Sequence, residues 1–156
     1  MIIRNFQESD QKSVEEIIAL YWTDPEFLEE VSGKMRSCGK EIARKGYGFI
    51  VAEERGEIVG ISGFKELDDY LKPYATTDKP VEFYILAVKQ KRKGVGEKLK
   101  QKQIEEVQKL GFSEILLYSP NSHKESWHFH DRLGFKRAGE VTPPDDGAGQ
   151  VWRKVL

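Results

Sequence analysis

Residues 88–99 read Val-Lys-Gln-Lys-Arg-Lys-Gly-Val-Gly-Glu-Lys-Leu, and this stretch decides how the chain is interpreted. It joins an apolar run, Phe83 to Val88, to a segment from Gly94 to Leu110 whose apolar spacing predicts a helix. A glycine-bearing turn that opens a helix directs free backbone N–H groups toward one point, where the helix dipole adds partial positive charge. The lysines and the arginine of the turn add further positive charge. The stretch therefore predicts a pyrophosphate site.

The composition predicts a globular chain of one domain, residues 1–156, because 156 residues with 38% hydrophobic and 33% charged side chains can bury a sizeable core. A net charge of −1 gives no general positive field, so nucleic acid is not an expected partner. The single cysteine, Cys38, allows no intramolecular disulfide and no Cys-based metal site. We find neither a signal peptide nor an apolar run of membrane-spanning length, which predicts a cytoplasmic protein with no membrane partner.

The predicted elements run in the order strand, helices, three strands, helix, strand, helix, two strands. Strands are expected at 2–6, 46–54, 57–64, 81–88, 114–118, 135–141 and 150–156, and the helical stretches after the first helix at 25–45, 94–110 and 123–133. The first helix contains Val14 to Tyr21 and is capped either by Ser13, in a Ser-x-x-Glu capping box, or by Asp10. This order predicts an α/β (α+β) fold, with a mixed central sheet of about six to seven strands flanked by helices.

Two motifs lie on this framework, about 40 residues apart. The first is Lys-Arg-Lys-Gly-Val-Gly at 91–96, and the second is Trp-His-Phe-His-Asp-Arg-Leu-Gly-Phe at 127–135. They resemble the (Gln/Arg)-x-x-Gly-x-(Gly/Ala) phosphate loop and the aromatic-helix-Gly-Phe signature of the GNAT superfamily of acetyl-CoA-dependent N-acetyltransferases. The element order matches that family over essentially the whole chain. The resemblance therefore implies the GNAT fold and acetyl-CoA as cosubstrate.

The resemblance also implies which residues hold acetyl-CoA. The backbone of Leu86, Ala87 and Val88 would pair with the pantetheine arm as an added strand would, and either Asn121 or His123 would also bind that arm. Amides of the loop and the first helical turn would hold the pyrophosphate: Arg92, Lys93, Gly94, Val95, Gly96 and Glu97. Lys91 stands where the family usually has Gln or Arg, and the stretch from Val88 to Gly94 is about two residues shorter than usual. Either the loop is short, or the strand ends at Leu86.

Acetyl transfer to an amine needs a base for the ammonium, a hydrogen-bond donor for the thioester oxygen, and an acid for the leaving thiolate. Glu82 is the candidate base. Alternatively, Glu82 has no catalytic role and its carboxylate faces solvent or pairs with a lysine. His130 stands where the family commonly has a tyrosine, so it is the candidate acid or else a packing histidine. Tyr118 and Tyr84 are further candidate donors, and both also fit as core or cleft-wall aromatics.

Other ligands fit the sequence less well. His123, His128 and His130 fall within eight residues, and a helix would place the first and last on one face, but no carboxylate or cysteine completes a tetrahedral set. We therefore predict no metal. Leu99 occupies the third glycine position of a dinucleotide-binding fingerprint, which excludes that motif. The basic run at 89–93 could be a solvated loop or a nucleic-acid patch, and without the following glycines and helix the solvated loop would be favoured. A lysine or arginine of this run could also pair with the 3′-phosphate of CoA.

The sequence thus predicts an N-acetyltransferase that moves an acetyl group from acetyl-CoA to a primary amine by direct attack. The acceptor is a small molecule or a peptide lysine. Acidic residues in the segments that form the acceptor side in this family favour a cationic amine: Asp24, Glu26, Glu29, Glu30, Asp68 and Asp69. The alternative is a protein of the same fold that binds acyl-CoA as a sensor or interaction module, with weak catalysis. A homodimer is compatible with the resemblance, since many relatives pair as dimers.

Overall fold

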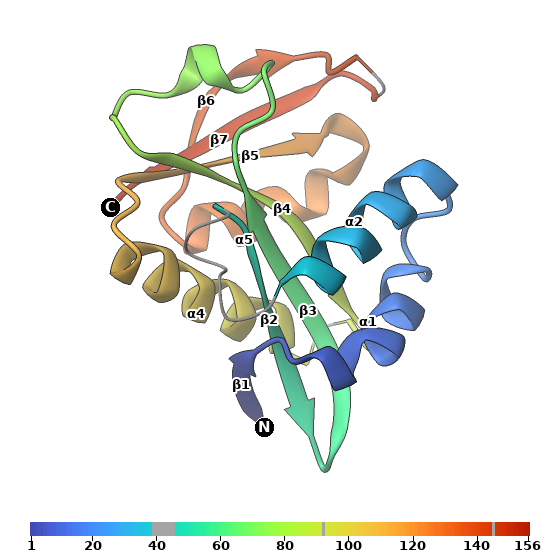
Figure 1. The fold of residues 1–156 in the computed structure, drawn as a ribbon. Helices are drawn as coiled ribbons and strands as arrows, with labels where there is room; N and C mark the ends of the chain where they lie inside the picture. The colour runs from blue at the N-terminus through green and yellow to red at the C-terminus, as the bar shows by residue number, and fades with distance from the viewer. Residues whose placement is uncertain (39–45, 92, 145) are drawn as a thin grey trace. The chain divides into compact units, whose positions relative to one another are not determined.

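The computed structural model describes residues 1–38, 46–91, 93–144 and 146–156 (Figure 1). It confirms the predicted α/β fold with a mixed sheet. The strands are β1 (Ile2–Asn5), β2 (Gly48–Glu54), β3 (Glu57–Lys65), β4 (Pro80–Val88), β5 (Glu114–Pro120), β6 (Lys136–Val141) and β7 (Gly149–Val155). The α-helices of the described residues are α1 (Gln11–Ile18), α2 (Pro25–Ser37), α4 (Val95–Lys109) and α5 (Trp127–Arg132). Hydrogen bonds join the strands in the order β1-β2-β3-β4-β5-β7-β6.

The chain forms two compact units that share two elements. The first comprises Met1–Phe64 and Ile85–Ile104, and the second comprises Lys65–Tyr84 and Glu105–Leu156. β4 and α4 each begin in one unit and end in the other. The first unit therefore holds β1, β2, nearly all of β3 and the end of β4, and the second holds the start of β4 with β5, β7 and β6.

In the first unit, the strands predicted at 46–54 and 57–64 are present as β2 and β3, and they form an antiparallel hairpin with Gly48 paired to Phe64 and Glu54 to Glu57. Gly56 has a φ of 79° in the turn between them, a conformation that glycine adopts without strain. Successive β2 side chains point to opposite faces. Ile50 and Ala52 pack against Val95 and Leu99 of α4, while α1 and α2 lie on the other side of the hairpin (Figure 1).

The start of α1 differs from the predicted capping box. α1 begins at Gln11, which places Ser13 inside the first turn and Asp10 at the cap position. Asp10 does not cap α1 with its side chain. Its carboxylate instead accepts the Gln7 N–H at 2.8 Å and two guanidinium bonds from Arg4 at 2.7 and 2.9 Å. Asp10 therefore fixes the turn that joins β1 to α1.

In the second unit, β4 and β5 pair in parallel from Pro80 with Glu114 to Glu82 with Leu116. β5 then pairs antiparallel with β7 along its whole length, and β6 pairs with the far edge of β7. A core of Leu71, Leu116 and Val151 lies beneath this part of the sheet. This arrangement places Glu82 at a strand position that is buried, with 3% of its surface exposed.

Two helix predictions were wrong in detail. The segment predicted as one helix over 123–133 is a 3-10 helix, Asn121–Ser126, followed by α5. His123 has non-helical angles (φ −108°, ψ 45°), so His123 and His130 do not share a helix face. Leu110, the last residue of the helix predicted over 94–110, lies just beyond the end of α4 and is 43% exposed. The helix predicted over 25–45 is present as α2, which ends at Ser37 because Cys38 has non-helical angles (φ −80°, ψ 70°). Residues 39–45 lie outside the described part.

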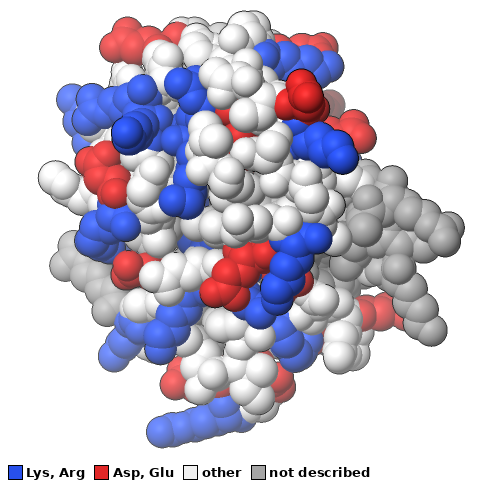
Figure 2. Space-filling model, turned by 90° about the vertical axis from the view of Figure 1, so that its left-hand side faces the viewer, with Lys and Arg blue, Asp and Glu red and all other residues white. Residues whose placement is uncertain are grey.

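The described surface carries charges of both signs. Figure 2 shows basic and acidic side chains interspersed over one face, in keeping with the net charge of −1. No helix in the described ranges is both long enough and apolar enough to cross a lipid bilayer.

Candidate functional site

The turn between β4 and α4, in the first unit, has the geometry of an anion site. β4 ends at Val88, so the connection to Gly94 is short and the strand does not stop at Leu86. The first backbone bond of the helix runs from the Lys98 N–H to the Gly94 C=O at 3.2 Å. The N–H groups of Val95, Gly96 and Glu97 therefore precede the helical ladder and point out of the helix start. Such a start binds phosphate groups.

Glycine suits positions 94 and 96 of this turn for different physical reasons. Gly94 has a φ of 75°, a left-handed conformation that costs other L-residues about 1–2 kcal/mol. At Gly96 the φ is not positive, and an added Cβ would meet only the Leu86 side chain at 3.5 Å, an ordinary contact. The protein itself thus does not require glycine at 96. A bare backbone there leaves room for a phosphate to approach closely.

The end of β4 presents two of the three expected backbone partners on one edge. The Lys89 N–H donates to the Val59 C=O of β3 at 2.8 Å, and the Ala87 carbonyl also faces β3, 3.3 Å from where a Gly60 Cβ would lie. Backbone groups alternate along a strand. The N–H and C=O groups of Leu86 and Val88 therefore point away from β3, whereas those of Ala87 point toward it.

The basic side chains around the turn are partly engaged within the first unit. Lys89 lies 3.5 Å from a carboxylate oxygen of Glu57, and the Lys91 ammonium lies 5.6 Å from the centre of the Tyr21 ring. Lys93 is exposed. Arg92, one of the expected phosphate-binding residues, lies outside the described residues.

Glu82, in the second unit, is held by the segment that follows β3. Its Oε1 accepts the Asp68 N–H at 2.9 Å, and its Oε2 lies 3.9 Å from the Lys65 ammonium. That ammonium also lies 2.5 Å from Oδ1 of Asp68. Glu82 is therefore buried and paired to a lysine, so the solvent-facing alternative was wrong. No sequence motif identified Lys65 or Asp68 as its partners.

Two tyrosines of the second unit remain protonated at neutral pH. Burial, reinforced by the Asp146 carboxylate, raises the pKa of Tyr118 to about 12. Burial, followed by the charges of Glu82 and Asp68, raises the pKa of Tyr70 above its ordinary value. Their rings meet edge to face with centroids 6.1 Å apart. The Tyr118 hydroxyl donates to the Gly147 carbonyl. Tyr70 lies outside both sequence motifs, so it was not among the predicted site residues.

His130 lies in α5 among aromatic rings of the second unit. It is 8% exposed. Its ring centroid lies 5.2 Å from that of Trp152, 5.8 Å from that of Phe129 and 6.3 Å from that of Phe135. The imidazole therefore fills part of the core, which supports its packing role. Its role as a proton donor stays a prediction.

Asn121 and His123 lie on the 3-10 helix that follows β5. The Asn121 side-chain oxygen accepts from the Gln150 amide at 3.2 Å, and the His123 carbonyl accepts from the Ser126 hydroxyl at 2.7 Å. Both side chains are exposed. The choice between them as ligands of the pantetheine arm stays open. Among the described residues, no group of three or more His, Cys, Asp or Glu side chains is placed to hold a metal ion.

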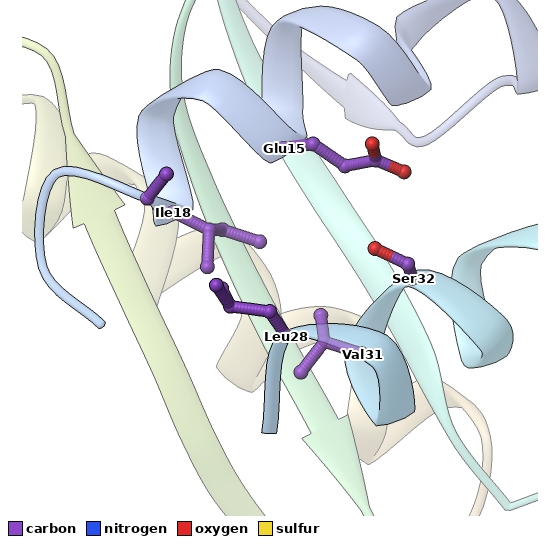
Figure 3. A pocket seen from close by; sticks show the side chains of 6 residues that line it. Glu15, Ile18, Leu28, Val31 and Ser32 are labelled. Atoms are coloured by element: carbon purple, nitrogen blue, oxygen red, sulfur yellow. The ribbon is translucent and has the colours of Figure 1, made fainter. Parts of the chain in front are cut away.

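A cavity of about 230 Å³ opens between α1 and α2 in the first unit. Its lining is formed by Glu15, Ile18, Ala19, Leu28, Val31 and Ser32. In Figure 3 the Glu15 carboxylate and the Ser32 hydroxyl face each other at one end, and the methyl groups of Ile18, Leu28 and Val31 converge at the other. The Gln11 amide donates to Glu15 at 2.8 Å. The cavity thus combines one carboxylate with an apolar wall.

The sequence of residues 14–135 matches the model of the acetyltransferase (GNAT) family. This range covers well over half of the 156 residues and includes both the phosphate-loop motif and the Gly134-Phe135 pair. No curated protein matches the chain in sequence.

Solved structures resemble the chain over nearly its whole length. Against a ribosomal-protein-alanine N-acetyltransferase from Brucella melitensis the identity is 18% and the TM-score 0.76, with 100% of each chain covered. For an aminoglycoside 6′-N-acetyltransferase from Enterococcus faecium the identity is 16% and the TM-score 0.74, with 99% of this chain and 97% of that one covered. For a PaiA N-acetyltransferase from Thermoplasma acidophilum, solved in complex with coenzyme A, the identity is 16% and the TM-score 0.69, with 99% of this chain and 98% of that one covered. At these identities the likeness shows the fold alone.

Proposed function

Because the chain belongs to the GNAT family of acetyltransferases, we propose that it transfers an acetyl group from acetyl-CoA to a primary amine. The observation that carries this proposal is the start of α4. Gly94 makes a left-handed turn there, and three backbone N–H groups precede the first helical hydrogen bond. That arrangement suits a pyrophosphate, and acetyl-CoA supplies both a pyrophosphate and an activated acyl group.

The residues of the first unit fit the cosubstrate in two places. The amides from 92 to 97 would hold the pyrophosphate, and the outward backbone groups of Leu86 and Val88 would pair with the amides of the pantetheine arm. Ala87 is less suited, because its carbonyl faces β3. Lys93 would add charge near the phosphates.

The chemistry is assigned to the second unit. Glu82 would take a proton from the ammonium, directly or through a water molecule, so that the neutral nitrogen attacks the thioester carbonyl. The new C–N bond forms as the C–S bond breaks, and the thiolate takes a proton from His130 or from Tyr118. The acylated nitrogen then gives its surplus proton back to that group, and the proton held by Glu82 leaves to solvent. The products are an N-acetyl amide and free CoA. No covalent enzyme intermediate is needed.

The acceptor is proposed to be a cationic amine with an apolar stem. Several of the acids that favoured a cation have local partners: Asp24 caps α2, Glu29 pairs with Arg36, and Asp69 with Lys72. Glu15 differs because it borders the cavity between α1 and α2. Its carboxylate would attract an ammonium, and Ile18, Leu28 and Val31 would contact the stem.

The second candidate is a protein of this fold that binds acyl-CoA with little catalysis. It is favoured by one observation: both candidate acids are engaged, His130 among aromatic rings and Tyr118 with the Gly147 carbonyl. The cytoplasmic location, the single domain, the homodimer and the lack of nucleic-acid, membrane and metal partners stay predictions.

Two measurements test the proposal in sequence. Thermal stabilisation by acetyl-CoA tests binding, since a ligand of the native state raises its stability by mass action. Release of free thiol with a panel of primary amines then tests transfer. Stabilisation followed by thiol release with cationic amines supports the enzyme. Stabilisation without thiol release over the whole panel supports the sensor, and no stabilisation at saturating acetyl-CoA contradicts both.

A further inference from the structure

We infer that Tyr21 competes with the cosubstrate for the edge of β4: its hydroxyl holds the outward carbonyl of Val88 and must release it when the acyl-CoA arm adds to this edge. The inference rests on the proposed function, because it concerns the same strand edge. It assigns a role to the segment between α1 and α2, which the sequence motifs left without one.

The contact is a direct hydrogen bond. The Tyr21 hydroxyl donates to the Val88 carbonyl at 2.6 Å, across 67 residues of sequence. Val88 is the last residue of β4. Its carbonyl points away from β3, as the Lys89 bond to Val59 requires. Tyr21 therefore occupies an acceptor that an added strand would use.

Tyr21 also touches the beginning of the phosphate loop. The Lys91 ammonium lies over its ring, 5.6 Å from the centroid, in a cation–π contact. The Tyr21 ring meets Trp22 at 5.9 Å, and Trp22 meets Phe27 of α2 at 5.5 Å. One exposed side chain thus links the strand edge, the loop and α2.

The hydroxyl is placed to compete with a ligand. An extended ligand adds to a sheet edge through main-chain hydrogen bonds, and a pantetheine amide would donate to the Val88 carbonyl in that way. Tyr21 is 38% exposed, so burial does not fix its position. Displacement of Tyr21 would shift the segment that joins α1 to α2, the two helices that line the cavity in Figure 3. Cosubstrate binding would then be felt where the acceptor is proposed to bind.

The test compares two ligands on matched variants. Tyr21→Phe removes the hydroxyl and keeps the ring beneath Lys91. Tyr47→Phe is the control, because Tyr47 also has a lysine, Lys34, over its ring and belongs to the same unit. The ligands are acetyl-CoA and adenosine 3′-phosphate 5′-diphosphate, the nucleotide half of CoA, which lacks the arm. Calorimetric titration gives both dissociation constants.

We expect Tyr21→Phe to lower the Kd for acetyl-CoA about threefold to tenfold, the worth of one hydrogen bond that no longer has to be broken. The Kd of this variant for the nucleotide should stay unchanged. In Tyr47→Phe the Kd for acetyl-CoA and the Kd for the nucleotide should both stay unchanged. An unchanged or raised Kd for acetyl-CoA in Tyr21→Phe overturns the inference while the proposed function stands. If the wild type does not bind acetyl-CoA, the proposed function itself fails.

Discussion

The main-chain N–H of Asp68 donates a 2.9 Å hydrogen bond to Oε1 of Glu82. The two residues are 14 apart in sequence, and the contact ties the segment after β3 to β4, the first strand of the parallel pair. Lys65 lies 3.9 Å from the other carboxylate oxygen. These contacts fix the direction of a buried carboxylate, which is what a positioned general base requires.

Replacing Glu82 with glutamine tests the base. The amide keeps the size of the side chain and can still accept the Asp68 N–H, but it cannot take a proton from an ammonium. We expect kcat to fall about 100-fold or more, while acetyl-CoA binding stays close to wild type. Thiol-release kinetics and calorimetric titration measure the two quantities.

Glu66→Gln is the matched control, since Glu66 is an exposed carboxylate of the same segment. It should retain wild-type kcat. A Glu82→Gln variant with full turnover would remove Glu82 from the mechanism and leave it as a structural partner of Asp68 and Lys65.

His130 can be tested by two aromatic replacements. Phenylalanine preserves the ring contacts with Trp152 and Phe135 but cannot donate a proton, whereas tyrosine restores the residue that the family commonly has there. We expect kcat/KM to fall about 100-fold in His130→Phe and to stay near wild type in His130→Tyr. If both variants keep wild-type turnover, His130 serves packing alone and Tyr118 becomes the preferred acid.

We expect the contribution of Glu114 to the free energy of unfolding to be lost at acidic pH. Glu114 is fully buried at the start of β5, and its carboxylate accepts the N–H groups of Thr76 and Thr77 at 2.6 and 2.8 Å and the Thr76 hydroxyl at 2.9 Å. Burial opposes ionisation, but these donors outweigh it and hold the pKa of Glu114 below the ordinary value of 4.5. Its stabilisation is therefore present above that value and is lost as the pH falls through the folded pKa.

Glu114→Gln should lower the free energy of unfolding at neutral pH by about 3 kcal/mol. The amide NH2 group would replace one carboxylate oxygen and would face a threonine N–H or hydroxyl donor, from which it cannot accept a hydrogen bond. The difference in free energy of unfolding between the variant and the wild type should narrow as the pH falls from 4.5 through the lower pKa of the folded state. Denaturant unfolding across this pH range measures both effects. Glu125→Gln, at an exposed carboxylate of the same unit, should change neither. A gap that is constant with pH would mean that the charge of Glu114 contributes nothing.

Local patterns were enough to predict the fold. Gly94, with a φ of 75°, opens the helix predicted over 94–110, and Gly111, with a φ of 92°, follows that range directly. Gly56 lies between the strands predicted at 46–54 and 57–64. These features depend on neighbours in sequence. The 3-10 segment was missed because the Ser126 hydroxyl bonds to the His123 carbonyl, an alternative to the regular helical bond that short polar side chains offer.

The environment of the candidate site could not be predicted in the same way. The residue types at Glu82, His130 and the phosphate loop were recognisable, because chemistry limits which side chains can serve. Their partners were not. The bonds from Asp68 to Glu82 and from Tyr21 to Val88 span 14 and 67 residues, and only the packing of the folded chain brings such pairs together.

The central claim is that the Gly94 turn binds the phosphates of acetyl-CoA, and two glycines allow a matched test. Gly94 and Gly56 both have left-handed φ values, 75° and 79°, and neither has an atom within 4 Å of an added Cβ. Alanine should therefore impose the same backbone strain at each, about 1–2 kcal/mol. Only Gly94 lies in the proposed phosphate loop.

The most direct measurement is the Kd for acetyl-CoA of the wild type, Gly94→Ala and Gly56→Ala by calorimetric titration. We predict that the wild type and Gly56→Ala bind alike and that Gly94→Ala binds about tenfold more weakly, because the loop relaxes from the left-handed turn and must be strained again to bind. Equal binding by all three proteins, or no binding by the wild type, would contradict the claim.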